Sequence, residues 1–143
     1  MGMKLTDPAK DTIPAGIWGM DNHVIDIPPQ TENAETSMTC KADRDMDVFG
    51  ILGHMHKMGK QLDVFPAETA AGEALVSEPW SFGDQPIAPV THHVSNGDSL
   101  TLRCRHSNTT QKEIKYGESS DNEMCVLVLY YAPKRDVRSC VQR

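Results

Sequence analysis

The sequence predicts an all-β domain, an antiparallel, jelly-roll-like β-sandwich of eight or nine short strands held by two disulfides. Short apolar or alternating runs recur along the chain, and turn residues separate them at near-regular spacing. A helical 3.6-residue pattern of useful length does not occur. The four cysteines include no Cys-x-x-Cys pair, which favours two disulfides over a zinc site.

Proline, glycine or polar turn residues bound most of the expected strands. Residues 123–131 form the most apolar β-type run, so this run is the expected central strand. Gly59 interrupts the segment 48–65, which is therefore either two strands or one strand with a bulge. The expected strands cover residues 23–27, 36–41, 48–65, 75–76 with 80–82, 92–94, 99–104, 113–116 and 123–131.

Length and composition indicate one globular domain. We place it at residues 27–143, after a lead-in of residues 1–26 with room for a first strand. A net charge of −6 with scattered basic residues argues against nucleic acid or an anionic membrane surface as a partner. No apolar run approaches the roughly 18 residues that span a bilayer.

The cysteine content predicts an oxidising compartment. We therefore expect a secreted or periplasmic protein. Residues 1–10 lack the apolar core of a signal peptide, so we expect that such a peptide is not part of this sequence.

A candidate metal site is carried by His54, His56 and Met124. On a strand, residues two apart point to the same face, with their backbone positions about 6.5–7 Å apart. The two imidazoles can then converge on one ion, and Met124 adds a thioether. This ligand set suits copper, whereas zinc rarely accepts a thioether, and magnesium and calcium prefer carboxylates. The sequence therefore predicts one copper ion with an open position for water, dioxygen or substrate.

Three motifs in order carry a resemblance to a known family: 54–60 (HMHKMGK), 97–104 (GDSLTLRC) and 117–125 (GESSDNEMC). Together they resemble the C-terminal domain of the copper type II, ascorbate-dependent monooxygenases. That family includes peptidylglycine α-hydroxylating monooxygenase and dopamine β-monooxygenase. The resemblance covers about residues 27–140 and agrees with the β-sandwich expected from the strand pattern.

The resemblance implies a function and a set of site residues. It implies hydroxylation of a substrate C–H bond with dioxygen at a copper held by His54, His56 and Met124, with ascorbate as the external reductant. It also implies a partner, an electron-donating copper domain with three histidines, which this sequence does not contain; the domain alone is then inactive or needs that partner. The implied disulfides are Cys40–Cys140 and Cys104–Cys125.

The chain departs from the peptide-processing members of the family at three positions. Those enzymes hold the substrate carboxylate with an arginine two positions before the first ligand histidine, where this chain has Leu52. An asparagine and a tyrosine that contact substrate are here Val126 and Val128. The metal site therefore carries over and the peptide site does not, which leaves an unknown small molecule as substrate.

Two other functions stay open. One is a secreted or periplasmic protein that stores, delivers or senses copper without hydroxylase activity. The other is a structural sandwich that has kept the ligands without using them.

Several other side chains have simpler expected roles. Met55 and Met58 are expected in the core, with an auxiliary Cu(I) contact from one of them as the alternative. Trp80 and Phe82 are also expected in the core. Asp121 and Glu123 are expected loop carboxylates that could orient a ligand.

The pattern assigns no firm role to three histidines. His92 and His93 point to opposite faces of a strand, so at most one reaches a site, and surface positions are favoured for both. Solvent exposure in a turn is favoured for His106 over an accessory copper role. Asn108 begins a glycosylation sequon, which has meaning only in a eukaryotic secreted protein.

Overall fold

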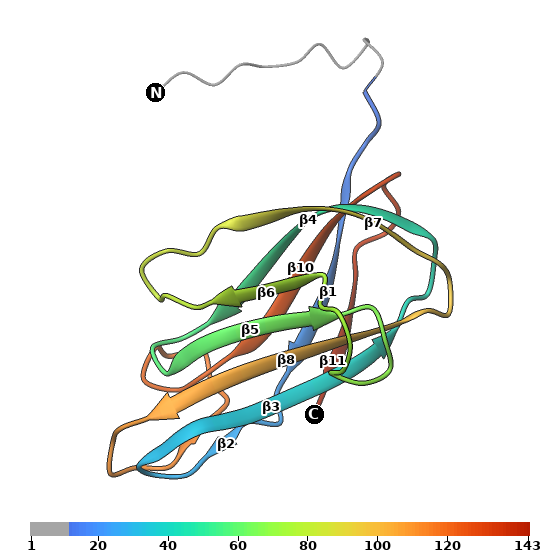
Figure 1. The fold of residues 1–143 in the computed structure, drawn as a ribbon. Coiled ribbons are helices and arrows are strands. Elements are labelled where there is room, and N and C mark those ends of the chain that lie inside the picture. Colours follow the sequence, from blue (N-terminus) through green and yellow to red (C-terminus); the bar gives the residue numbers. More distant parts are fainter. Residues whose placement is uncertain (1–11) are drawn as a thin grey trace, which may run out of the picture.

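Eleven β-strands form the described part of the chain, residues 12–143 of the computed structural model (Figure 1). The strands are β1 (Gly16–Asn22), β2 (Asp26–Ile27), β3 (Thr31–Lys41), β4 (Met46–Met55), β5 (Gly59–Phe65), β6 (Val76–Pro79), β7 (Ile87–Val94), β8 (Ser99–Asn108), β9 (Ile114–Lys115), β10 (Cys125–Ala132) and β11 (Arg138–Gln142). Within these residues no helix is long and apolar enough to cross a membrane.

Two sheets enclose the core, as the sequence predicts. One has the order β11-β1-β10-β4-β7 and the other β3-β8-β5-β6, while β2 and β9 form a small separate pair. The β1–β11 pair is parallel and the other pairs are antiparallel. The predicted all-β sandwich is confirmed, and β10 is the third of five strands in its sheet, which confirms its central position.

The strand boundaries differ from the expected ones at both ends of the chain. The expected strand over 23–27 is instead β1, which ends at Asn22, followed by the two-residue β2. β1 alternates buried and less buried residues, with Trp18 and Met20 in the core. The polar C-terminal tail forms β11, because hydrogen bonds to β1 stabilise a strand that has no apolar pattern of its own.

The segment 48–65 forms β4 and β5, joined by a tight turn in which the N–H of Gly59 donates to the carbonyl of His56 at 3.2 Å. A Cβ at position 59 would lie 2.5 Å from Trp80 Cδ1 and 2.8 Å from Met55 Cβ, so only glycine fits. The register with β8 also shifts between Gly59 and Gln61. The predicted interruption at Gly59 is therefore confirmed.

Two disulfides connect the sheets in the pairing that the resemblance implied. Cys40–Cys140 joins the edge strands β3 and β11, and Cys104–Cys125 joins the inner strands β8 and β10. All four cysteines of the sequence are paired in these two bonds. Disulfides of this kind are typical of proteins that fold in an oxidising compartment.

The predicted core residues are correct in three cases and wrong in one. Met55 is fully buried, and Met58 and Trp80 pack against the core. Phe82 is 44% exposed, because Ser81 pairs with Asp84 and places Phe82 at the tip of a tight turn.

Strand β8 continues to Asn108, beyond the expected end at Cys104, and this changes the role of two residues. His106 lies on the buried side of the strand with 0% exposure, so the expected solvent exposure is wrong. Asn108 is 1% exposed, and its Nδ2 donates to the carbonyls of Ile27, Pro28 and Lys112. The sequon asparagine therefore holds the loop after β8 and is not accessible to a glycan.

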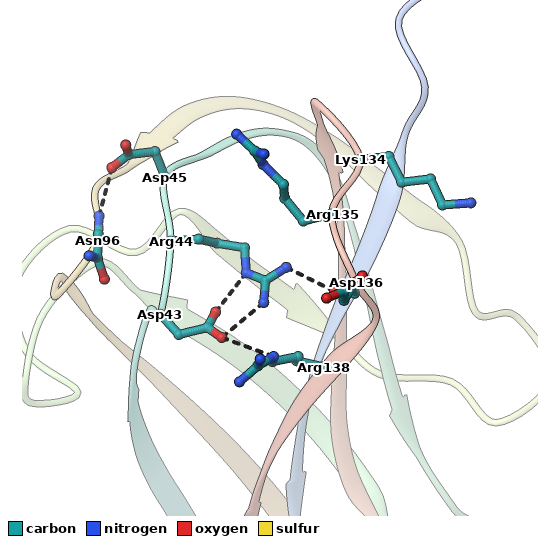
Figure 2. Close-up of a pocket in the computed structure, with 8 residues that line it drawn as sticks. All are labelled: Asp43, Arg44, Asp45, Asn96, Lys134, Arg135, Asp136 and Arg138. Carbon is teal, nitrogen blue, oxygen red and sulfur yellow. Dashed lines mark hydrogen bonds and ion pairs between the residues drawn. The ribbon is translucent and has the colours of Figure 1, made fainter.

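An ion cluster lines an open pocket of about 840 Å³ between the turn before β4 and the segment after β10 (Figure 2). The guanidinium of Arg44 donates to both carboxylate oxygens of Asp43, at 2.8 and 2.9 Å, and to the carbonyl of Asp136 at 2.8 Å. Arg138 also pairs with Asp43 at 3.5 Å. The Arg44 guanidinium holds the pKa of Asp43 below its usual value. These charges fasten the chain after β10 to the turn before β4.

Candidate metal centre

The two histidines of the candidate site lie side by side. His54 is the second-last residue of β4 and His56 is the first residue beyond it, yet their ring centroids are 5.2 Å apart with the planes at 86°. His56 is 5% exposed and His54 is half-buried. The structure therefore brings these two imidazoles together, although β4 ends between them.

Each imidazole is oriented through its Nδ1 atom. His54 Nδ1 lies 2.9 Å from Gln85 Oε1, and Gln85 Nε2 in turn donates to the carbonyl of Phe82. His56 Nδ1 lies 3.2 Å from the carbonyl of Asn122. Because these oxygens accept hydrogen bonds, each Nδ1–H is the donor, and the Nε2 atoms keep their lone pairs for a metal. This is the outer hydrogen bonding typical of metal-ligating histidines.

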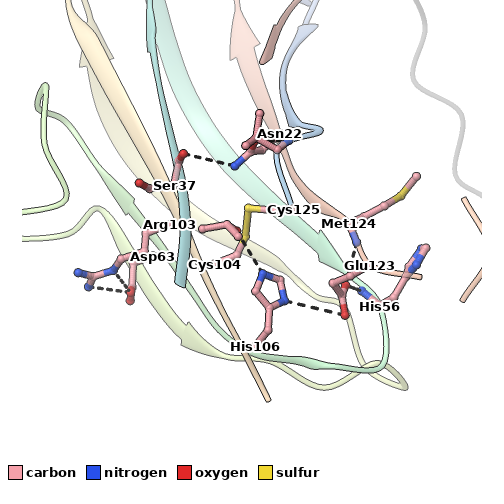
Figure 3. The surroundings of a disulfide bond; sticks show 12 residues. Asn22, Ser37, His56, Asp63, Arg103, Cys104, His106, Glu123, Met124 and Cys125 are labelled. Atoms are coloured by element: carbon pink, nitrogen blue, oxygen red, sulfur yellow. Dashed lines mark hydrogen bonds and ion pairs between the residues drawn. A yellow bond between two sulfur atoms is a disulfide. The ribbon is translucent and has the colours of Figure 1, made fainter. Parts of the chain in front are cut away.

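A buried carboxylate joins the histidine segment to Met124. Glu123 is fully buried, and its Oε1 accepts from the backbone N–H groups of His56 and Met124. Its Oε2 accepts from the N–H of Met58 at 2.9 Å. Figure 3 shows the side chains of His56 and Met124 leaving this carboxylate on the same side, away from the Cys104–Cys125 disulfide. Burial raises the pKa of Glu123, and the three N–H donors oppose the rise.

The register of β10 on β4 completes this arrangement. Cys125, the residue after Met124, pairs with Met55, and Val126 pairs with His54. Cys125 is in turn bonded to Cys104 of β8. The half-buried Met124 is thus held at the start of a strand whose first residues lie beside the two histidines.

Two aromatic side chains from the β6–β7 connection border the histidines. The Trp80 ring lies edge-on to His54 at 6.4 Å, and its Nε1 donates to the carbonyl of His56 at 3.3 Å. Phe82 lies edge-on to His56 at 6.3 Å. Sequence reasoning missed the contributions of Gln85 and Asn122. Asn122 lies inside the third motif, but Gln85 has no local signal, because its contact depends on how the β6–β7 connection folds back.

The candidate donor set is two imidazole nitrogens and one thioether sulfur. Within residues 12–143 no group of three or more His, Cys, Asp or Glu side chains is placed to hold a metal. Two imidazoles and a thioether suit copper, and the thioether favours the Cu(I) state. By the chemistry of their donors, these residues fit copper.

His106 lies behind Glu123, on the opposite side from His56 (Figure 3). Its Nε2 lies 3.2 Å from Thr36 Oγ1, and its Nδ1 has no hydrogen-bond partner, with Glu123 Oε2 at 3.9 Å. Burial lowers the pKa of His106 to about 4, so the ring is neutral at pH 7. Its ring lies beside the Glu123 carboxylate on the core side.

We expect the free energy of unfolding of the copper-free protein to decrease as the pH falls from 6.5 to about 4. Buried His106 stays neutral in the folded protein, whereas it takes up a proton in the unfolded chain. The lowered pKa corresponds to a loss of about 3 kcal/mol across this range. Urea unfolding of wild type and His106→Gln at several pH values measures this pH dependence of the free energy of unfolding. The dependence should be shallower in the variant. Glu123, whose raised pKa has the opposite sign, remains in both proteins. Equal slopes would contradict this prediction.

Of the other expected residues, His93 and Asp121 are exposed, whereas His92 is half-buried. His92 and His93 belong to β7, opposite Val48 and Asp47 of β4. Exposed His93 pairs with Asp47 at 2.7 Å, which raises the pKa of His93. Asp121 is exposed and pairs with Lys57 at 3.0 Å. Of the two expected loop carboxylates, Glu123 is the one that contacts the candidate site.

A comparison with known families matches this chain. The model of the family "Copper type II ascorbate-dependent monooxygenase, C-terminal domain" matches residues 13–143. The chain belongs to this family. The family name denotes copper enzymes that use ascorbate and act on a substrate with dioxygen.

Several curated proteins are similar to this chain at low sequence identity. DBH-like monooxygenase protein 2 of Homo sapiens is 24% identical over 92% of this chain and 29% of its own length. DBH-like monooxygenase protein 2 of Mus musculus is 25% identical over 80% of this chain and 21% of its own length. DBH-like monooxygenase protein 1 of Gallus gallus is 25% identical over 90% of this chain and 23% of its own length. The chain spans less than a third of the length of these relatives.

Among solved structures, the chain is similar to the infectious bursal disease virus VP2 subviral particle. The TM-score is 0.33 and the identity 11%, over 92% of this chain and 42% of that one. A likeness this weak supports no argument about function.

Proposed function

We propose that this domain binds one copper ion through His54 Nε2, His56 Nε2 and Met124 Sδ, and acts as the oxygen-activating half of a copper monooxygenase. The observation that carries the proposal is the pair of imidazoles 5.2 Å apart, each with its Nδ1 engaged by an oxygen. Family membership over residues 13–143 supports the choice of metal.

Copper bound there would supply the redox chemistry that inserts one oxygen atom of dioxygen into a substrate C–H bond. Gln85 and Asn122 hold the two imidazoles with their Nε2 atoms free. Glu123 holds the backbone of His56 and Met124 at one point. Three protein ligands leave a position open for dioxygen or substrate. Ascorbate would be the external reductant, and a second copper domain or another electron donor would deliver its electrons. The disulfides favour a secreted or periplasmic location.

We also propose that the substrate is a small molecule that places no carboxylate beside His54. In β4, Leu52 and His54 alternate with buried Ile51 and Met55, so they lie on the face away from the core. In the same register, Val126 lies opposite His54 and Val128 opposite Leu52. The positions that neighbour His54 on this face are therefore apolar, and apolar substrate surface is favoured there over a peptide terminus.

Copper titration tests the proposed ligands. We expect a type II Cu(II) signal in electron paramagnetic resonance that is lost in His54→Ala and His56→Ala, with affinity reduced by about 100-fold or more. Met124→Ala should weaken Cu(I) binding selectively, since the soft sulfur favours Cu(I). His93 is an exposed histidine on β7, so His93→Ala is the matched control and should bind copper as wild type does. Absence of copper uptake in both oxidation states would refute the proposal.

Oxygen consumption with ascorbate distinguishes an enzyme from a copper carrier. Consumption coupled to a hydroxylated product supports the monooxygenase. Copper-dependent peroxide without a hydroxylated product favours storage, delivery or sensing of copper.

A further inference from the structure

The sandwich is closed along one side and open along the other. On one side the Cys40–Cys140 disulfide joins the edge strands β3 and β11. On the other side the edge strands are β6 and β7, and a cleft of about 500 Å³ lies between them. Figure 1 shows the chain passing from β6 to β7 along this open side.

The sequence explains why these two edges do not close on each other. β6 has only four residues and ends at Pro79. Pro86 and Pro89 lie at the start of the opposite edge and have no N–H to donate. Ile87 consequently stays 53% exposed at the mouth of the cleft.

The lining of the cleft defines the ligand that it could accept. Its floor and walls are apolar and include Ile51, Leu62, Leu75 and Val90. The charged residues of the lining are Glu78 and Asp84, both exposed, and both acidic. The volume lies within the range of small-molecule sites, about 300–1,000 Å³. An apolar lining with an acidic rim favours an uncharged ligand over an anionic one.

Trp80 connects the cleft to the candidate metal centre. Its ring lines the cleft, and its Nε1 donates to the carbonyl of His56. The cleft lies on the core side of β4, because a Cβ on Gly53 would contact Leu62 across the sandwich. His54 and its apolar neighbours lie on the other face of β4, so the cleft and the proposed copper ligands are on opposite faces of this strand, with Trp80 next to both.

We propose that the cleft between β6 and β7 is a binding site for an uncharged, largely apolar small molecule. The site goes beyond the proposed copper chemistry and does not depend on it. Its occupant contacts the walls from both sheets and uses Trp80 as one wall.

Titration of copper-free protein with 1-octanol tests the proposal. We expect saturable binding in a Trp18→Phe background, where Trp80 is the remaining tryptophan and its fluorescence follows the titration. Methyl shifts in nuclear magnetic resonance are expected at Ile51, Leu62 and Ile87. The methyl groups of Val128, on the outer face, should not shift. Octanoate should bind at least about fivefold more weakly, because Glu78 and Asp84 repel its carboxylate. Because no copper is present, the result is independent of the proposed function.

A matched pair of variants locates the binding. Ala88→Phe adds bulk inside the cleft and should weaken octanol binding at least about tenfold, whereas Thr91→Phe, on the same strand but outside the lining, should not. If Ala88→Phe does not fold, the map of methyl shifts in wild type decides. Non-saturable binding, shifts at Val128 instead of the cleft, or unchanged affinity in a folded Ala88→Phe would each overturn the proposal.

Discussion

Glu123→Ala is expected to lower the free energy of unfolding of the copper-free protein by about 3–5 kcal/mol. The fully buried carboxylate accepts the backbone N–H groups of His56, Met58 and Met124. Alanine leaves these donors without an acceptor in a region that water does not reach readily, and each such donor costs about 1–3 kcal/mol. Urea denaturation followed by circular dichroism measures the loss.

Two further variants make this prediction specific. Asp121→Asn, in the same loop, removes only an exposed ion pair with Lys57, and should cost less than about 1 kcal/mol. Glu123→Gln keeps one acceptor oxygen but places an amide donor against an N–H, so an intermediate loss is expected. If Glu123→Gln folds, it should also bind copper more weakly, although all three proposed ligands remain. Equal stability of Glu123→Ala and Asp121→Asn would rule out the role of this carboxylate.

Removing the Cys40–Cys140 disulfide is expected to have the other large effect. The bond closes a loop of 100 residues, for which the chain-entropy model gives about 4–5 kcal/mol. It also joins the edge strands β3 and β11, and β11 has few apolar contacts of its own. The double variant Cys40→Ala/Cys140→Ala should therefore unfold at much lower urea concentration than wild type.

The second disulfide provides the comparison. Cys104 and Cys125 are 21 residues apart, so Cys104→Ala/Cys125→Ala should lose less, about 3 kcal/mol. Because Cys125 follows Met124 directly, this variant should weaken Cu(I) binding more than the Cys40→Ala/Cys140→Ala variant does. Mass mapping without reduction checks the pairing first. A greater loss of stability from the Cys104–Cys125 pair would contradict the loop-length argument.

Local patterns in the chain were sufficient for much of the fold. Residues 123–131 alternate in side-chain burial as a strand packed on one face does, and the strand over 125–132 is central in its sheet. Gly59 marks the turn between β4 and β5, because the space at that position excludes a Cβ. These signals are reliable because strand periodicity and turn chemistry depend on neighbouring residues.

The errors occurred where a residue's environment is set by another segment. His106 is buried because β8 continues past the expected end to pair with β3, and the local sequence does not mark this extension. Phe82 is exposed because Ser81 and Asp84 form a tight turn that lifts it from the core. The short strands β2 and β9 lie within the expected strands 23–27 and 113–116, but each is limited to two residues, because their pairing with each other covers only those positions.

The motif around His54-Met55-His56, the distant Met124 and the four cysteines could all be identified from the residues alone. The tertiary structure decided how these parts meet. Strand pairing places Val126 beside His54, one carboxylate from Glu123 holds both segments, and Gln85 reaches His54 from the β6–β7 connection. These contacts include residues far apart in the chain, since Gln85 and His54 are 31 positions apart and Glu123 and His56 are 67 positions apart. Local sequence patterns do not reveal these contacts, because such pairings form only when the two sheets pack and exclude water from the groups between them.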